Sequence, residues 1–153
     1  MSLLKARPTL CGDWLRVIKM DLFQECDFIS HAGLHLKWKI EMDALSDAEW
    51  DACATMIMEY QKRPFYEAVG IPRGGVKLAN ALNKYASGNP EDFTLICDDV
   101  YTTGTSFREF IEENYPTWTK GMGYRWVVFA RNPSYHNDFV KALFTMPERT
   151  DRD

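Results

Sequence analysis

The chain has 153 residues, of which 46% are hydrophobic and 26% charged, a balance that is typical of one globular domain and excludes a disordered chain. Its net charge of −4 argues against a general binder of nucleic acid or of anionic membranes. The sequence has no apolar run long enough to cross a membrane, and its first residues lack the apolar core of a signal peptide. We therefore expect a single domain over residues 1–153 with no membrane or nucleic-acid partner.

Residues 1–45 predict one helix and one strand. Residues 13–24 carry apolar side chains at helical spacing, so an amphipathic helix is expected there. Residues 34–42 alternate between apolar side chains and the polar His35, Lys37 and Lys39. Such alternation is typical of a half-buried strand.

From residue 46 onward, helices and strands are expected to alternate. Ser46 and Glu49 have the spacing of a capping box, which predicts a helix that begins there. The next helices are expected after residue 75 and over 106–114, and the strands over 65–69, 93–97, 124–130 and 139–145. Continuous apolar strands between helices are typical of a parallel sheet covered on both faces. Ligands of such sheets bind at the carboxyl ends of the strands.

The four cysteines show no CxxC spacing, and they are Cys11, Cys26, Cys53 and Cys97. Cys97 lies within an apolar run, so it is interpreted as a reduced thiol of the core. A reduced core thiol favours a cytoplasmic location over a secreted disulfide framework.

The segment LICDDVYTTGTSF, residues 95–107, places two acids between a predicted strand and a hydroxyl-rich loop. The adjacent carboxylates of Asp98 and Asp99 repel each other unless ligand hydroxyls or a cation lie against them. Small residues that open a helix let backbone N–H groups converge on a phosphate, and here they are Thr102, Thr103, Gly104, Thr105 and Ser106. A ribose 5-phosphate offers hydroxyls to the two carboxylates and a phosphate to the loop. The alternative is an ordinary turn with solvated carboxylates, but the complete run favours a ligand site.

LICDDVYTTGTS resembles the phosphoribosyl pyrophosphate (PRPP) signature of type I phosphoribosyltransferases, and its DDVxTxGT spacing is closest to orotate phosphoribosyltransferases. GIPRGG, residues 70–75, resembles the pyrophosphate loop of the same family, which often contains a non-proline cis peptide bond. Residues 28–45 resemble the hood that covers the base in orotate enzymes. The resemblance implies the α/β fold of that family: a mainly parallel sheet flanked by helices over 46–153, and a small N-terminal hood over 1–45.

The resemblance also implies roles for individual residues. Arg73, Gly74 and Gly75 would hold pyrophosphate, and residues 102–106 would hold the 5′-phosphate. Asp98 and Asp99 would act with Arg73 in catalysis, and would meet Mg²⁺ through water or ribose hydroxyls. The base would contact Arg131, Thr102, His31 and Lys37, with His31 at a position where the family usually has lysine.

The implied reaction transfers 5-phosphoribosyl from PRPP to a base, with an orotate-like pyrimidine favoured, in a homodimer that uses Mg²⁺. One departure stands out, because residues 87–92 (SGNPED) replace the long basic loop that closes over the site in most family members. This segment is too short to close over a ligand, and its two acids would repel pyrophosphate. Two other interpretations remain open: a non-catalytic regulator that binds PRPP or a nucleotide, and a structural subunit of a complex.

Overall fold

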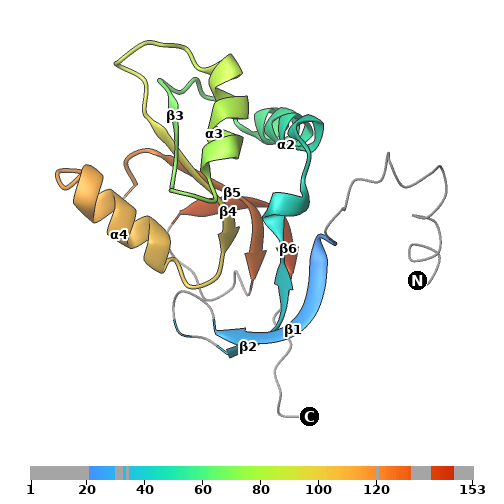
Figure 1. The fold of residues 1–153 in the computed structure, drawn as a ribbon. Coiled ribbons are helices and arrows are strands. Elements are labelled where there is room, and N and C mark those ends of the chain that lie inside the picture. Colours follow the sequence, from blue (N-terminus) through green and yellow to red (C-terminus); the bar gives the residue numbers. More distant parts are fainter. Residues whose placement is uncertain (1–20, 30–32, 34, 120, 132–138, 147–153) are drawn as a thin grey trace.

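The computed structural model describes residues 21–29, 33, 35–119, 121–131 and 139–146, and structural statements below concern this part of the chain. Its two sheets are shown in Figure 1. The larger sheet is parallel, with the strand order β3-β4-β5-β6. Its strands are β3 (Ala68–Gly70), β4 (Leu95–Tyr101), β5 (Tyr124–Arg131) and β6 (Val140–Met146). The smaller sheet is the antiparallel pair of β1 (Phe23–Ile29) and β2 (His35–Ile40).

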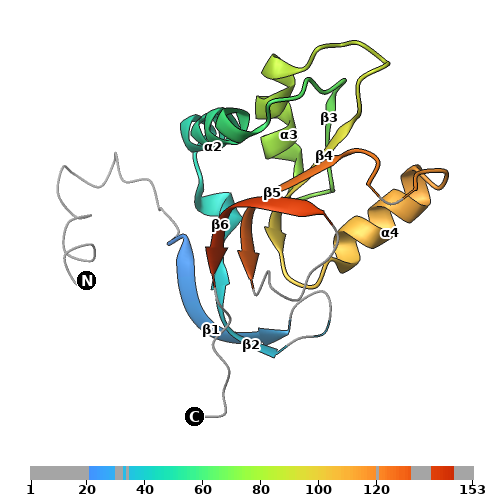
Figure 2. The same cartoon turned by 180° about the vertical axis from the view of Figure 1, so that it is seen from behind.

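Helices cover both faces of the parallel sheet, as Figures 1 and 2 show from opposite sides. They are η3 (Met42–Ala44), α2 (Asp47–Tyr60), α3 (Val76–Leu82), η4 (Asn83–Tyr85) and α4 (Thr105–Asn114). Trp126 and Val128 of β5 belong to the core cluster that contains α2 and α3. Val127, between them, belongs to the cluster that contains Phe107 of α4. This alternation confirms that an apolar strand of the sequence is buried from both sides.

The capping box predicted at the start of α2 is present. Ser46 Oγ accepts a hydrogen bond from the Glu49 amide at 3.2 Å, and the Glu49 carboxylate accepts one from the Ser46 amide at 2.8 Å. These two bonds satisfy backbone donors that the first turn of a helix leaves unpaired. The helix that follows lies on α3 in the core.

The N-terminal region forms a hairpin, which the sequence pattern did not predict. The expected helix over 13–24 is wrong at its end, because Phe23 opens strand β1 and pairs with Ile40 of β2. Residues 13–20 lie outside the described part. The strand expected over 34–42 is confirmed as β2, in which Lys37 is exposed while Trp38, Lys39 and Ile40 are all half-buried, so the expected alternation is only partly present. Pairing with β2 satisfies the backbone of β1 and so overrides its local helical pattern.

Strand boundaries in the core differ from expectation by a few residues. The strand expected over 65–69 is displaced to Ala68–Gly70, while Phe65 is still buried in the core. The strand expected over 93–97 runs to Tyr101, so Asp98 and Asp99 lie inside β4 and do not follow it. The helix expected over 106–114 and the strand over 139–145 are present to within one residue. Among the described helices, none has both the length and the apolarity that crossing a membrane requires.

Candidate functional site

Two loops emerge side by side at the carboxyl edge of the parallel sheet. Strands β3 and β4 run in the same direction, with Gly70 paired to Cys97. The segment GIPRGG leaves β3 at this point, and Asp98 and Asp99 follow Cys97 in β4. The Ile71 amide donates to the Cys97 carbonyl at 2.9 Å and ties the segment to the strand. The structure thus brings the two motifs of the sequence together.

The glycines of GIPRGG allow this loop to touch β4. A Cβ atom at Gly74 would lie 2.5 Å from Oδ2 of Asp99, so any larger residue would push into the carboxylate. A Cβ atom at Gly75 would overlap the carbonyl oxygen of Cys97. The peptide bond between Pro72 and Arg73 is cis, as the resemblance implied for this loop. Glycine is therefore needed at 74 for close approach of the loop to the Asp99 carboxylate, and at 75 for close approach of the two backbones.

Arg73 presents its charge at the surface of this loop. Its side chain is 88% exposed, and its guanidinium lies 3.9 Å from the Asp43 carboxylate. An exposed pair at that distance contributes little to stability. The guanidinium can therefore turn toward an anion bound at the loop.

Asp98 is buried and Asp99 half-buried in β4. Asp98 Oδ1 accepts a hydrogen bond from the Asp99 amide at 2.8 Å, and Asp99 Oδ1 accepts one from the Val100 amide at 2.7 Å. Burial, followed by the neighbouring Asp99 carboxylate, raises the pKa of Asp98 to about 8. At neutral pH the unliganded protein therefore holds a proton on Asp98 that hydroxyls or a cation would displace.

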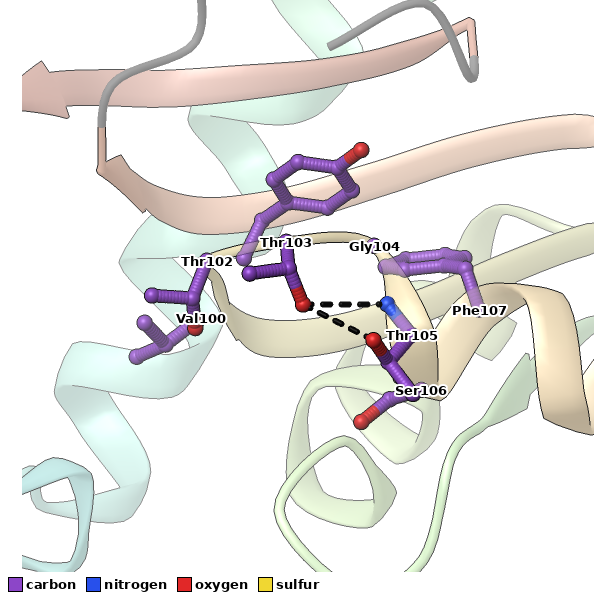
Figure 3. A pocket seen from close by; sticks show the side chains of 8 residues that line it. Val100, Thr102, Thr103, Gly104, Thr105, Ser106 and Phe107 are labelled. Atoms are coloured by element: carbon purple, nitrogen blue, oxygen red, sulfur yellow. Dashed lines mark hydrogen bonds between the residues drawn. The ribbon is translucent and has the colours of Figure 1, made fainter. Parts of the chain in front are cut away.

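The hydroxyl-rich loop encloses a small hollow that Figure 3 shows. Its volume is about 40 Å³, and residues 100–107 line it. Thr103 Oγ1 lies 2.9 Å from Thr105 Oγ1 and accepts a hydrogen bond from the Thr105 amide at 3.4 Å. Gly104 has φ of +85°, a left-handed conformation that favours glycine, and helix α4 begins immediately after it. Hydroxyls and amides at a helix N-terminus suit a phosphate group.

Arg131 ends strand β5, as its position after the apolar run suggested, but it is buried at 3% exposure. It donates a short hydrogen bond to the Trp38 carbonyl. Its guanidinium carbon lies 3.6 Å from the centroid of the Trp38 ring. The hairpin and the core are thereby joined at Arg131.

The other residues expected at the base are more dispersed. Thr102 lines the hollow of the hydroxyl-rich loop. Lys37 is exposed on β2, and His31 lies outside the described residues. Their contact with a base stays a prediction.

Residues 87–92 form a short turn, which is held by a hydrogen bond within it and by another to the chain before β3. Ser87 Oγ donates to the Asp92 carboxylate at 2.6 Å, and the Gly88 amide donates to the Tyr66 carbonyl at 3.1 Å. The turn precedes β4 and lies beside the chain that precedes β3, at the amino edge of the sheet and opposite the acids (Figure 1). Its two acids therefore lie away from the GIPRGG loop, so the repulsion of pyrophosphate expected from them does not fit this geometry.

Sequence reasoning missed Arg108. This residue lies in the first turn of α4, where its guanidinium donates to the Thr103 carbonyl at 3.1 Å. A basic residue four positions after the glycine of the loop was the available signal. Its place beside the loop makes it part of the site.

No protein-family model matches the sequence, and neither does any curated protein. Among solved structures, an orotate phosphoribosyltransferase from Aeropyrum pernix is similar at 20% identity and a TM-score of 0.63, over 81% of this chain and 88% of that one. UMP synthase of Leishmania donovani is similar at 16% identity and a TM-score of 0.61, over 82% of this chain and 34% of that one.

A Mycobacterium tuberculosis orotate phosphoribosyltransferase in complex with inorganic phosphate is similar at 14% identity and a TM-score of 0.57, over 80% of this chain and 87% of that one. Likeness at such low identity establishes the fold alone. The chain has the type I phosphoribosyltransferase fold, which confirms the fold that the resemblance implied.

Proposed function

We propose that this protein transfers the 5-phosphoribosyl group of PRPP to a nucleobase, with an orotate-like pyrimidine favoured, and releases pyrophosphate and a nucleoside monophosphate. The observation that carries the proposal is the contact of Gly74 with Asp99, which brings the GIPRGG loop and the acid pair together beside the hydroxyl-rich loop. We further propose that residues 1–153 act as one domain in the cytoplasm, as a homodimer.

In the proposed reaction, a ring nitrogen of the base loses its proton to solvent and forms a bond to C1 of the ribose, while the bond from C1 to the pyrophosphate oxygen breaks. Positive charge develops on the ribose, and negative charge develops on the leaving pyrophosphate. Residues 102–106 would fix the 5′-phosphate, and Asp98 and Asp99 would accept hydrogen bonds from the ribose hydroxyls. Arg73 and the Gly74 and Gly75 amides would stabilise the pyrophosphate. The protein would thus act by positioning and by charge stabilisation.

The acid pair fits Mg²⁺ that is held mainly by the substrate. Among the described residues, there is no group of three or more His, Cys, Asp or Glu side chains arranged to hold a metal ion. Asp98 and Asp99 each accept a backbone amide at Oδ1, and their carboxylates would turn from each other to metal-bound water or ribose hydroxyls when the ligand binds. Mg²⁺ keeps several waters and binds substrate phosphates, which suits this donor set. When bound, it would neutralise charge on the pyrophosphate.

A second candidate is a regulator that binds PRPP or a nucleotide without turnover. The position of residues 87–92 favours it, because in the described chain this connection lies at the edge of the sheet opposite the acids. A site that stays open to water is poor at protecting a reactive ribose cation.

The test combines binding with turnover. PRPP with Mg²⁺ at 100 times its dissociation constant should stabilise the protein by about 2.7 kcal/mol. For a chain of this size, that corresponds to a melting temperature higher by roughly 5–10 °C. Pyrophosphate release is then measured with a panel of bases, with the double variant Asp98→Asn, Asp99→Asn as the control. Binding with release supports the enzyme, binding without release supports the regulator, and no binding at millimolar PRPP by a folded protein would refute both.

A further inference from the structure

The guanidinium of Arg108 bridges the two threonines that flank Gly104. Nη1 donates to the Thr103 carbonyl at 3.1 Å, and Nη2 lies 3.5 Å from Thr105 Oγ1. The Arg108 amide also donates to the Gly104 carbonyl at 3.0 Å. One residue of α4 therefore contacts all three residues at the centre of the loop.

The hydrogen bond to Thr103 has a consequence for the next amide. The peptide bond between Thr103 and Gly104 is trans, since the described backbone has its cis bond at Pro72–Arg73. In a trans peptide the C=O and N–H groups point in opposite directions. By holding the Thr103 carbonyl, Arg108 directs the Gly104 N–H away from itself. Gly104 is left-handed, a conformation that occurs in the concave backbone arrangements that bind anions.

The charge of Arg108 is placed against the helix dipole. The structure describes all of α4, and its first turn carries this cation and no acidic residue. A positive charge in the first turn is unfavourable for a helix by itself, because the N-terminal end of the dipole is also positive. An anion bound at the loop would attract both this cation and the positive end of the dipole, and so would offset their repulsion. The position is therefore costly for the helix alone and favourable for an anion site.

We propose that Arg108 is a positioning residue for phosphate recognition. It holds the peptide between Thr103 and Gly104 in the orientation in which the Gly104 amide meets the 5′-phosphate. It acts through the loop and not by direct contact with the ligand. This inference rests on the proposed function, since it assumes that the loop holds the phosphate of a ribose 5-phosphate unit.

The experiment uses ribose 5-phosphate as the probe, with inorganic phosphate as a second probe. NMR titration of the full chain follows the Gly104 amide and gives the dissociation constant. Arg108→Ala should weaken ribose 5-phosphate binding roughly tenfold, the loss expected when a charge-assisted hydrogen bond is removed. It should also reduce the shift of the Gly104 amide on binding. Because Arg108 is exposed, the variant should keep its fold, which its circular dichroism will show.

Two further variants separate positioning from charge. Arg108→Lys keeps the charge but loses the planar fork, so it should recover only part of the lost affinity. Arg63→Ala removes an exposed cation from another surface and should bind like the wild type. If Arg108→Lys recovered the full affinity for ribose 5-phosphate, charge alone would explain the role of Arg108 and the inference would be overturned. Wild-type affinity in Arg108→Ala would overturn it as well. If the wild type itself fails to bind ribose 5-phosphate, the proposed function falls together with the inference.

Discussion

Replacing Asp98 by asparagine should stabilise the unliganded protein at neutral and alkaline pH. Asparagine keeps the oxygen that accepts the Asp99 amide at 2.8 Å, and it removes the group that burial makes difficult to ionise. The substitution therefore changes charge while it preserves shape and the hydrogen bond. If the carboxylate pair stabilised the fold, the substitution would instead lower the free energy of unfolding.

The size of the effect follows from the pKa of Asp98, which rises from 3.8 to about 8 on folding. The folded state binds this proton more tightly than the unfolded state does. The contribution of Asp98 to the free energy of unfolding is therefore fully present below pH 4 and is lost as the pH rises toward 8. At about 1.4 kcal/mol per pH unit, the loss reaches at most about 4 kcal/mol at pH 7. Burying the new amide NH₂ group costs about 1–3 kcal/mol. The net gain at pH 7 should therefore be about 1–3 kcal/mol.

Urea unfolding followed by the fluorescence of the five tryptophans measures the difference. Wild type and Asp98→Asn are compared at pH 4, 6 and 8, with Glu113→Gln on the exposed side of α4 as the matched control. The stability of Asp98→Asn relative to the wild type should be near zero or negative at pH 4 and should increase toward pH 8. A difference that stays constant across this range, or a variant less stable than wild type at pH 8, would refute the reasoning.

Two other variants and one labelling experiment test separate parts of the structure. Gly74→Ala, whose Cβ would meet the Asp99 carboxylate, should lower PRPP affinity at least about tenfold by calorimetry, since the two motifs must move apart. The double variant Lys37→Ala, Lys39→Ala should lower the rate of pyrophosphate release if the hood supplies cations to the leaving group, and an unchanged turnover number would exclude that role. Cys97, whose pKa burial raises, should resist iodoacetamide at pH 8 until the protein unfolds, and mass spectrometry of the labelled peptide would detect early modification.

The core and the hydroxyl-rich loop could be predicted because their signals are local. Trp126 to Phe129 form an unbroken apolar run, and such a run between helices has few solutions other than a buried parallel strand. The acid pair and the hydroxyl-rich loop were recognisable for the same reason, since their chemistry is complete within a dozen residues.

The N-terminal hairpin and its contacts depend on residues far apart in sequence. Arg131 donates a hydrogen bond to the carbonyl of Trp38, 93 residues away, and no local pattern of the sequence indicates that pair. Phe23 lies within a helical spacing of apolar residues, and only its pairing with Ile40 makes it part of a strand. Long-range pairing of this kind overrides local propensity.

The contact between Gly74 and Asp99 also affects which groups lose conformational entropy when a ligand binds. Because these two segments already touch, a ligand that spans both loops finds the backbone preorganised and loses little free energy to ordering it. The side chain of Arg73 is 88% exposed, so it would lose rotamer freedom when it closes on a ligand. Immobilising it costs about 0.5–1.5 kcal/mol, a cost that falls on the diphosphate end of the ligand and not on the sugar phosphate. A ligand without the diphosphate would avoid this cost and would leave Arg73 exposed, as it is in the unliganded protein.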